Sequence, residues 1–250
     1  MPDARLVTIR FSHYCEKARW ALDRARVPYI EEAHPPLLSW RATFGAGGRR
    51  TAPVFVTREG HVLSESTEIL EHADRHGSAP PLFPDPATSV GKDVHALEDR
   101  FDRELGPHVR RFAYDYVLRG DADVIADLLS SGAGSFEARL ARRLRPVLVF
   151  GIRRGLKVDP AGVARSKAKL DPLFGDVEER LRDGRPYLAG DTFTAADLTF
   201  ASLAAPLAYP EAYARTAVPF DRLGADTRAM VEEFRARPAG RFVMRMYEGR

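Results

Sequence analysis

Cysteine is almost absent from this sequence, which contains one, Cys15, among 250 residues. A single thiol excludes a disulfide within the chain and any zinc site built on several cysteines. Scarce cysteine also fits a reducing compartment, where thiols stay free. We therefore expect no internal disulfide and no bound metal.

Long apolar runs and a strong net charge are also missing. No stretch is apolar enough to span a bilayer, and the N-terminus lacks the apolar core of a signal peptide. The 38 basic and 35 acidic residues leave a formal charge of only +3, which gives no electrostatic footprint for nucleic acid. These absences predict a soluble, cytoplasmic protein without a nucleic-acid partner and without stable membrane insertion.

The first third of the chain alternates between strand and helix patterns. Strands are predicted at 5–11, 27–32, 51–57 and 61–63, and helices at 14–26, within 37–44 and from residue 64. Ser64 or Ser66 is expected to cap the last of these helices. The resulting order, βαβαββα, predicts a small α/β domain whose sheet is covered by helices.

A segment rich in proline, glycine and serine, 76–86, separates this part from a helical remainder. We expect an α/β domain at 1–77, a linker at 78–87 and an all-helical domain at 88–250. Within the helical part, Pro107 is expected to bend or break the first long run. Terminal helices are predicted at 225–236 and 238–247.

Ser12 and Cys15 lie where the first strand ends and the first helix begins. The first turn of a helix has unpaired N–H groups and a partial positive charge, which favour an anion or a thiolate. A cysteine there can have a lowered pKa, and a serine hydroxyl there can donate to a thiolate. Lys17 and Arg19 follow on the same helix, and a solvated helix face is the preferred interpretation for both.

Two further pairs are candidates for binding. Pro53 follows Ala52 at the start of a strand, where an ordinary proline is tolerated. Glu65 and Ser66 stand at a helix start, where a carboxylate, a hydroxyl and backbone N–H groups can hold charged ligand groups. From the residues alone, a simple helix cap is the preferred interpretation of this second pair.

Three motifs in this order resemble the glutathione S-transferase superfamily: residues 12–19, residues 52–54 and the pair Glu65-Ser66. A fourth, Leu-x-Gly-Asp-x-x-Thr-x-Ala-Asp at 188–197, resembles the signature of that superfamily's C-terminal domain. There Thr194 and Asp197 have capping-box spacing, which predicts a buried helix at 195–208. The resemblance implies a thioredoxin-like N-terminal domain, an all-α C-terminal domain and a homodimer.

The resemblance also implies roles for single residues. Pro53 would form a cis peptide bond, and the main chain of Ala52 would pair with glutathione as an added strand. Glu65 and Ser66 would hold the γ-glutamyl end. Ser12 falls where serine-type members stabilise the glutathione thiolate, and Cys15 falls at the second position of a glutaredoxin-like Cys-x-x-Cys. Glutathione would be a co-substrate, and no other cofactor is implied.

Three activities remain open at this point. The favoured one conjugates glutathione, activated by Ser12, to a small apolar electrophile. A second is a thiol-disulfide or reductive reaction that uses Cys15. A third is a non-catalytic binding protein on the same fold.

The middle of the chain resembles the family least. Phe112, Tyr114 and Tyr116 can line a pocket for an apolar substrate, although a core position is preferred for them. The strongly basic stretch 136–157 can contact an anionic membrane or partner, and a solvated helix pair covering the site is the preferred interpretation.

Overall fold

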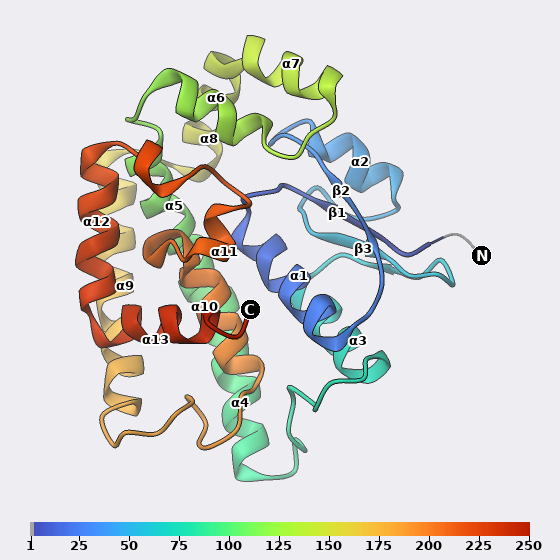
Figure 1. The fold of residues 1–250 in the computed structure, drawn as a ribbon, viewed down its shortest axis with the longest axis vertical. Coiled ribbons are helices and arrows are strands. Elements are labelled where there is room, and N and C mark those ends of the chain that lie inside the picture. The colour runs from blue at the N-terminus through green and yellow to red at the C-terminus, as the bar shows by residue number, and fades with distance from the viewer. Residues whose placement is uncertain (1–2) are drawn as a thin grey trace.

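Four short strands form a mixed sheet in the N-terminal third of the computed structural model, which describes residues 3–250 (Figure 1). Their order across the sheet is β2-β1-β3-β4. Strand β1 (Arg5–Thr8) is parallel to β2 (Ile30–Ala33) and antiparallel to β3 (Val54–Val56), which pairs in turn with β4 (Val62–Leu63). Central strand β1 therefore has neighbours on both sides, and its last three residues are buried.

Three helices complete this α/β part: α1 (His13–Ala25), α2 (Ser39–Gly45) and α3 (Ser66–His76). The element order matches the predicted βαβαββα. Strand β1 is shorter than the predicted 5–11, because the chain turns after it: the Ser12 N–H donates to the Ile9 carbonyl at 2.9 Å. That turn sets the position at which α1 begins.

The rest of the chain is helical. The elements are α4 (Ser89–Arg100), a π-helical segment (Phe101–Leu105), α5 (Gly106–Val117), α6 (Ala122–Ser130), α7 (Ser135–Arg143), α8 (Arg145–Leu156), α9 (Pro160–Arg180), α10 (Ala195–Ala208), α11 (Glu211–Ala214), a 3₁₀ turn (Phe220–Arg222), α12 (Ala225–Ala236) and α13 (Pro238–Tyr247). Among the helices within residues 3–250, none combines the length and the apolarity that crossing a membrane requires.

Pro107 is accommodated inside a helical run. Proline lacks the N–H that an α-helix needs, and its ring presses on the carbonyl four residues earlier. The preceding segment, Phe101–Leu105, widens into a π-helix, where the Gly106 N–H bonds to the Phe101 carbonyl. The chain therefore passes from α4 into α5 without leaving the helical conformation.

Helix α10 is the centre of the helical part and is buried on nearly every side. Asp197 starts it by accepting bonds from the N–H groups of Leu188 at 2.7 Å and Thr194 at 2.8 Å. The Thr194 hydroxyl completes the capping box, as predicted. Asp197 is fully buried, and desolvation raises the pKa of its carboxyl. Its role is structural.

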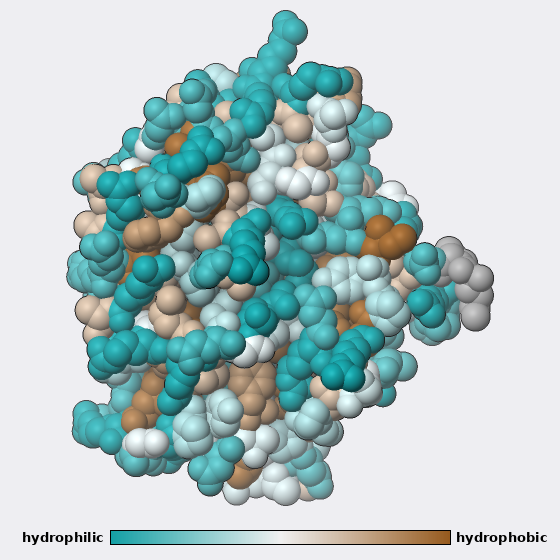
Figure 2. Space-filling view, in the orientation of Figure 1, coloured by the Kyte–Doolittle hydropathy of each residue, from teal (hydrophilic) through white to brown (hydrophobic). Residues whose placement is uncertain are grey.

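Helix α1 lies between the α/β part and the helical part, packed against both α3 and α10 (Figure 1). Apolar side chains on the face seen in Figure 2 form only small, separated areas, since most of them are used in the packed interior. The N-terminus of α1 reaches the place where β1, α5 and the segment after α10 meet. The candidate site lies there.

Candidate functional site

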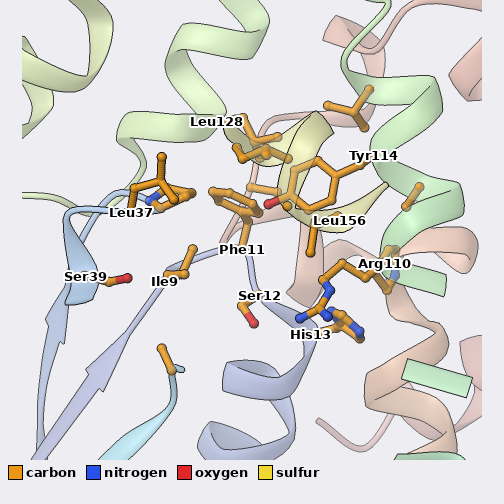
Figure 3. A pocket seen from close by; sticks show the side chains of 18 of the residues that line it. Ile9, Phe11, Ser12, His13, Leu37, Ser39, Arg110, Tyr114, Leu128 and Leu156 are labelled. Atoms are coloured by element: carbon orange, nitrogen blue, oxygen red, sulfur yellow. The ribbon is translucent and has the colours of Figure 1, made fainter. Parts of the chain in front are cut away.

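A cavity of about 580 Å³ opens between the N-terminal end of α1 and the helices α5 and α8 (Figure 3). Its walls come from the β1–α1 junction, the loop and helix after β2, residues 50–52, and the region from the end of α10 to residue 223. Most of the lining is apolar. The cavity thus joins the α/β half to the helical half.

Ser12 lies at the floor of this cavity and is the N-cap of α1. Its backbone is extended, and its Oγ accepts from the Cys15 N–H at 3.5 Å, which is a long and weak bond. Within residues 3–250 no acceptor takes the proton of this hydroxyl. The Ser12 hydroxyl is therefore available to donate to a ligand atom at a helix N-terminus.

Cys15 is completely buried one turn further along α1 and does not line the cavity. Its Sγ accepts from the Ile9 N–H at 3.5 Å. Desolvation raises the pKa of the thiol to about 11, and the nearby Arg19 only partly offsets this. The thiol is protonated near neutral pH and enclosed, which disfavours Cys15 as a nucleophile.

His13, to which the sequence assigned no role, is also buried at the cavity wall. Its Nε2 lies 3.0 Å from the Gly106 carbonyl oxygen. Burial lowers the pKa of this imidazole to about 3, and the charge of Arg110 lowers it further. His13 is therefore neutral at physiological pH. Because a carbonyl only accepts, Nε2 carries the proton and donates it.

Arg110 enters the cavity from α5 and reaches toward Ser12 and His13 (Figure 3). Its Nε is buried and has no hydrogen-bond partner. Sequence patterns alone gave no role for this residue. One feature of the sequence could have indicated it. Arg110 lies four and seven positions before Tyr114 and Val117, on the same helix face, where an apolar residue is expected.

Ala52 and Pro53 have the predicted geometry. Their peptide bond is cis. Ala52 lines the cavity and makes no backbone hydrogen bond within residues 3–250, whereas Pro53 is buried beneath it. The unpaired main chain of Ala52 forms a short edge on which an extended peptide can pair.

Glu65 and Ser66 lie at the start of α3, outside the cavity lining. Glu65 is the N-cap, in a capping box with Glu68, so the prediction that Ser64 or Ser66 caps this helix is wrong. The Glu65 carboxylate is exposed and pairs with Arg49 at 3.0 Å. Ser66 is buried, and its hydroxyl donates to Asp102 at 3.2 Å.

A buried ionic network holds Ser66 in place. The Lys17 ammonium has no solvent exposure and donates to Glu98 at 2.5 Å and to Asp102 at 2.7 Å. Thr67 Oγ1 lies 3.2 Å from the same nitrogen. The network ties α1 and α3 to α4 and to the π-helical segment.

The interpretation of Lys17 and Arg19 as part of a solvated helix face is therefore wrong. Arg19 is 4% exposed and pairs with Glu16 at 3.0 Å and with Glu31 at 2.8 Å. Both cations are buried because α1 is covered on one side by α3 and on another by α10. Each needs carboxylate partners in that position.

The atypical middle region supplies part of the cavity wall. Tyr114 faces the cavity, while Phe112 and Tyr116 pack on each other with ring centroids 5.2 Å apart, against the core. All three are partly buried and pack against the core, and of the three only Tyr114 also lines the cavity. Helix α8, in the basic stretch, contributes Leu156 and its neighbours to the same wall.

The structure thus brings Ser12 and Ala52 into one cavity and adds His13, Arg110 and Tyr114 to it. Pro53 supports Ala52 from below. Cys15, Glu65 and Ser66 do not line the cavity. The described residues 3–250 contain no cluster of three or more His, Cys, Asp or Glu side chains that could hold a metal ion.

Comparisons with known families match two separate parts of the chain. The family model "Glutathione S-transferase, N-terminal domain" matches residues 6–81, and "Glutathione S-transferase, C-terminal domain" matches residues 160–228. Helices α4 to α8 lie outside both matches, in agreement with the atypical middle. No curated protein matches the sequence.

Solved structures with the same fold include three informative relatives. A glutathione S-transferase from Rhodospirillum rubrum is 21% identical, with 96% of this chain and 91% of that chain covered and a TM-score of 0.55. The beta-etherase LigF from Sphingobium sp. strain SYK-6 is 16% identical over all of both chains, with a TM-score of 0.62. A glutathione S-transferase from Methylobacterium radiotolerans, in complex with glutathione sulfonate, is 18% identical over 97% and 95%, with a TM-score of 0.54. At these identities the likeness shows the fold alone.

Proposed function

Because this chain belongs to the glutathione S-transferase superfamily, we propose that it joins the thiolate of glutathione to a small apolar electrophile. The observation that carries the proposal is the free Ser12 hydroxyl at the N-terminus of α1, in one cavity with the unpaired main chain of Ala52. The main chain of Ala52 would position glutathione, and the Ser12 hydroxyl would donate to its sulfur.

Glutathione would lie extended across the edge of Ala52, with its γ-glutamyl end toward Glu65 and Ser66. Ser66 and the adjacent Asp102, whose side chain is 27% exposed, offer a hydroxyl and a carboxylate for the charged groups of that end. The Ser66 hydroxyl would exchange its bond to Asp102 for the ligand carboxylate. The cysteinyl sulfur would then point toward Ser12.

Ser12 would lower the pKa of the bound thiol by donating its hydroxyl proton to the thiolate, with help from the partial positive charge at the start of α1. The thiol proton leaves to solvent. The sulfur then attacks an electrophilic carbon, forming the C–S bond, while the leaving group departs with its electron pair. The apolar wall that includes Tyr114 and Leu156 would orient the electrophile and exclude water.

The reductive alternative needs an accessible thiolate at Cys15. That thiol is buried and has a raised pKa, so this alternative is less favoured. We further propose that the protein acts in the cytoplasm and as a homodimer, as the family resemblance implies. Light scattering coupled to size-exclusion chromatography tests the oligomeric state.

Calorimetry with glutathione on the wild type, Ser66→Ala and the exposed control Ser78→Ala tests the proposal. We expect saturable binding that Ser66→Ala weakens and Ser78→Ala does not. Turnover is then measured with chlorodinitrobenzene and other electrophiles on the wild type and Cys15→Ser. Absence of binding contradicts the glutathione assignment, and binding without turnover favours a non-catalytic protein. A disulfide-reducing activity that Cys15→Ser abolishes would favour the reductive reaction.

A further inference from the structure

The charges on the cavity wall are all of one sign. Among residues 3–250, three arginines line the cavity, namely Arg50, Arg110 and Arg154, and no aspartate or glutamate does so. The remaining lining is mostly apolar. An apolar chamber with cationic groups alone is expected to favour a ligand that is apolar and acidic.

Arg110 is the most informative of the three. Its Nε is buried without a partner, and no carboxylate within residues 3–250 forms an ion pair with its guanidinium. Its Cζ lies 5.9 Å from the centroid of the Tyr14 ring, at the outer limit of a cation–π contact, which supplies no negative charge. A partly desolvated cation without a counter-charge is unfavourable, and a bound anion would relieve that cost.

Neighbouring groups do not supply the missing charge. His13 is neutral and donates its proton to Gly106, so it offers no negative charge. Asp102 and Arg110 both influence the pKa of Tyr14 through their charges, so Asp102 is near. Its carboxylate, however, is paired with Lys17 at 2.7 Å. The guanidinium of Arg110 is thus available to pair with an anionic ligand.

The three arginines divide between the two halves of the cavity. Arg50 precedes Thr51 and Ala52 and stacks on Trp40 with 3.7 Å from Cζ to the ring centroid, on the side where a peptide would pair. Arg110 and Arg154 come from α5 and α8, which also supply the apolar wall. A glutathione carboxylate near Arg50 would leave the cations of the helical half unused.

We propose that the second substrate is an apolar electrophile that carries a carboxylate, and that Arg110 binds this carboxylate. This inference rests on the proposed function. The planar guanidinium matches a carboxylate through two parallel N–H···O bonds, which fixes the orientation of the substrate as well as its charge. With an aryl chloride of this class, the C–S bond forms as chloride leaves with the C–Cl electron pair.

Binding without chemistry provides the first test. Chlorobenzoate and the neutral chlorobenzamide are titrated calorimetrically into protein saturated with S-methylglutathione, which cannot react. We expect the wild type to prefer the benzoate by about tenfold or more, the worth of a charge-assisted hydrogen bond. Arg110→Met should remove that preference while the benzamide affinity stays unchanged. Arg110→Lys should keep part of it, since it keeps the charge.

Arg103→Met is the matched control. Arg103 lies two turns earlier and is exposed, with a partner at Asp99, so this variant loses one positive charge outside the cavity. It should keep the full preference for the benzoate. Thermal melting of each variant shows that the fold is intact.

Turnover provides the second test and separates the alternatives. Rates with chloronitrobenzoate and its methyl ester are each divided by the uncatalysed rate with glutathione. Arg110→Met should lower only the rate with the acid. An equal loss for acid and ester, together with a raised pKa of the bound glutathione thiol, would show that Arg110 serves the thiolate and would overturn the inference. If the wild type binds neither glutathione nor S-methylglutathione, the proposed function fails instead.

Discussion

The imidazole of His13 and the carbonyl of Gly106 are joined by a hydrogen bond of 3.0 Å, although 93 positions of the chain separate them. Next to it, the Tyr14 hydroxyl donates to the Asp102 carbonyl at 2.8 Å. These two bonds fix the start of α1 against the start of α5. The distance between Ser12 on one helix and Arg110 on the other depends on them.

Stability should fall in mild acid because of His13. Burial lowers the pKa of this imidazole from 6.5 to about 3, so below pH 6.5 the unfolded chain takes up a proton that the folded chain does not. The contribution of His13 is present above pH 6.5 and is lost as the pH falls toward 3, at up to about 1.4 kcal/mol per pH unit. Urea denaturation at pH 7 and pH 5 should show a smaller drop for His13→Gln. If His13→Gln lost as much unfolding free energy between pH 7 and pH 5 as the wild type, the assignment of a buried neutral imidazole would be contradicted.

Gly106→Ala should destabilise the protein, contrary to the usual effect of alanine within a helix. A Cβ on Gly106 would lie 2.2 Å from the Tyr14 hydroxyl, so the ring must move and its bond to Asp102 is lost. Overpacking of this kind costs about 1–3 kcal/mol in unfolding free energy. Gly175→Ala in α9 is the control, because its Cβ meets nothing within 4 Å. That variant should gain up to about 1 kcal/mol, so equal effects in the two variants would refute the steric argument.

Ser12→Ala should lower kcat/KM by about 10- to 100-fold, the worth of a hydrogen bond to a charged group. The pKa of the bound glutathione thiol should rise, which thiolate absorbance measures directly. The loss of the N-cap should also cost stability, about 0.5 kcal/mol, because the capping bond to the Cys15 N–H is long. Ser12→Thr keeps both the hydroxyl and the cap and should retain most activity. An unchanged thiol pKa in Ser12→Ala would remove Ser12 from the mechanism.

Cys15→Ala should leave kcat/KM unchanged, since the thiol is buried and does not line the cavity. Burial raises the pKa of this thiol from 9.0 to about 11, so its contribution to stability is present below pH 9.0 and is lost as the pH rises toward 11. The wild type should therefore lose more stability between pH 8 and pH 10 than Cys15→Ala, a comparison made by urea denaturation. Rapid alkylation of the native protein at pH 8 would contradict the burial.

Lys17→Met should lower the unfolding free energy by about 3–5 kcal/mol, because it leaves the carboxylates of Glu98 and Asp102 close together without a cation. Chemical denaturation measures this loss. Adding Glu98→Gln to Lys17→Met should restore part of it, since one buried charge is removed. No recovery in the double variant would show that packing of the lysine stem, rather than charge, accounts for the loss.

Local patterns in the sequence determined the order of the elements and several of their ends. The alternation of strand and helix periods predicted βαβαββα, the spacing of Thr194 and Asp197 predicted α10, and Pro238 marked the start of α13. These features depend on residues close together in the chain, such as a cap and its helix. The position of Ser12 at a strand-to-helix junction was predictable for the same reason.

Only the tertiary structure decided which side chains are buried and which meet at the site. Lys17, expected in solvent, and Cys15, a candidate nucleophile, are both enclosed because α1 packs on α3 and α10 at once. Arg110 stands beside Ser12 because α5 crosses the end of α1, a contact between segments about a hundred residues apart. Burial and electrostatics are set by such distant packing, so no local pattern in the chain encodes the pKa of Cys15 or the unpaired charge of Arg110.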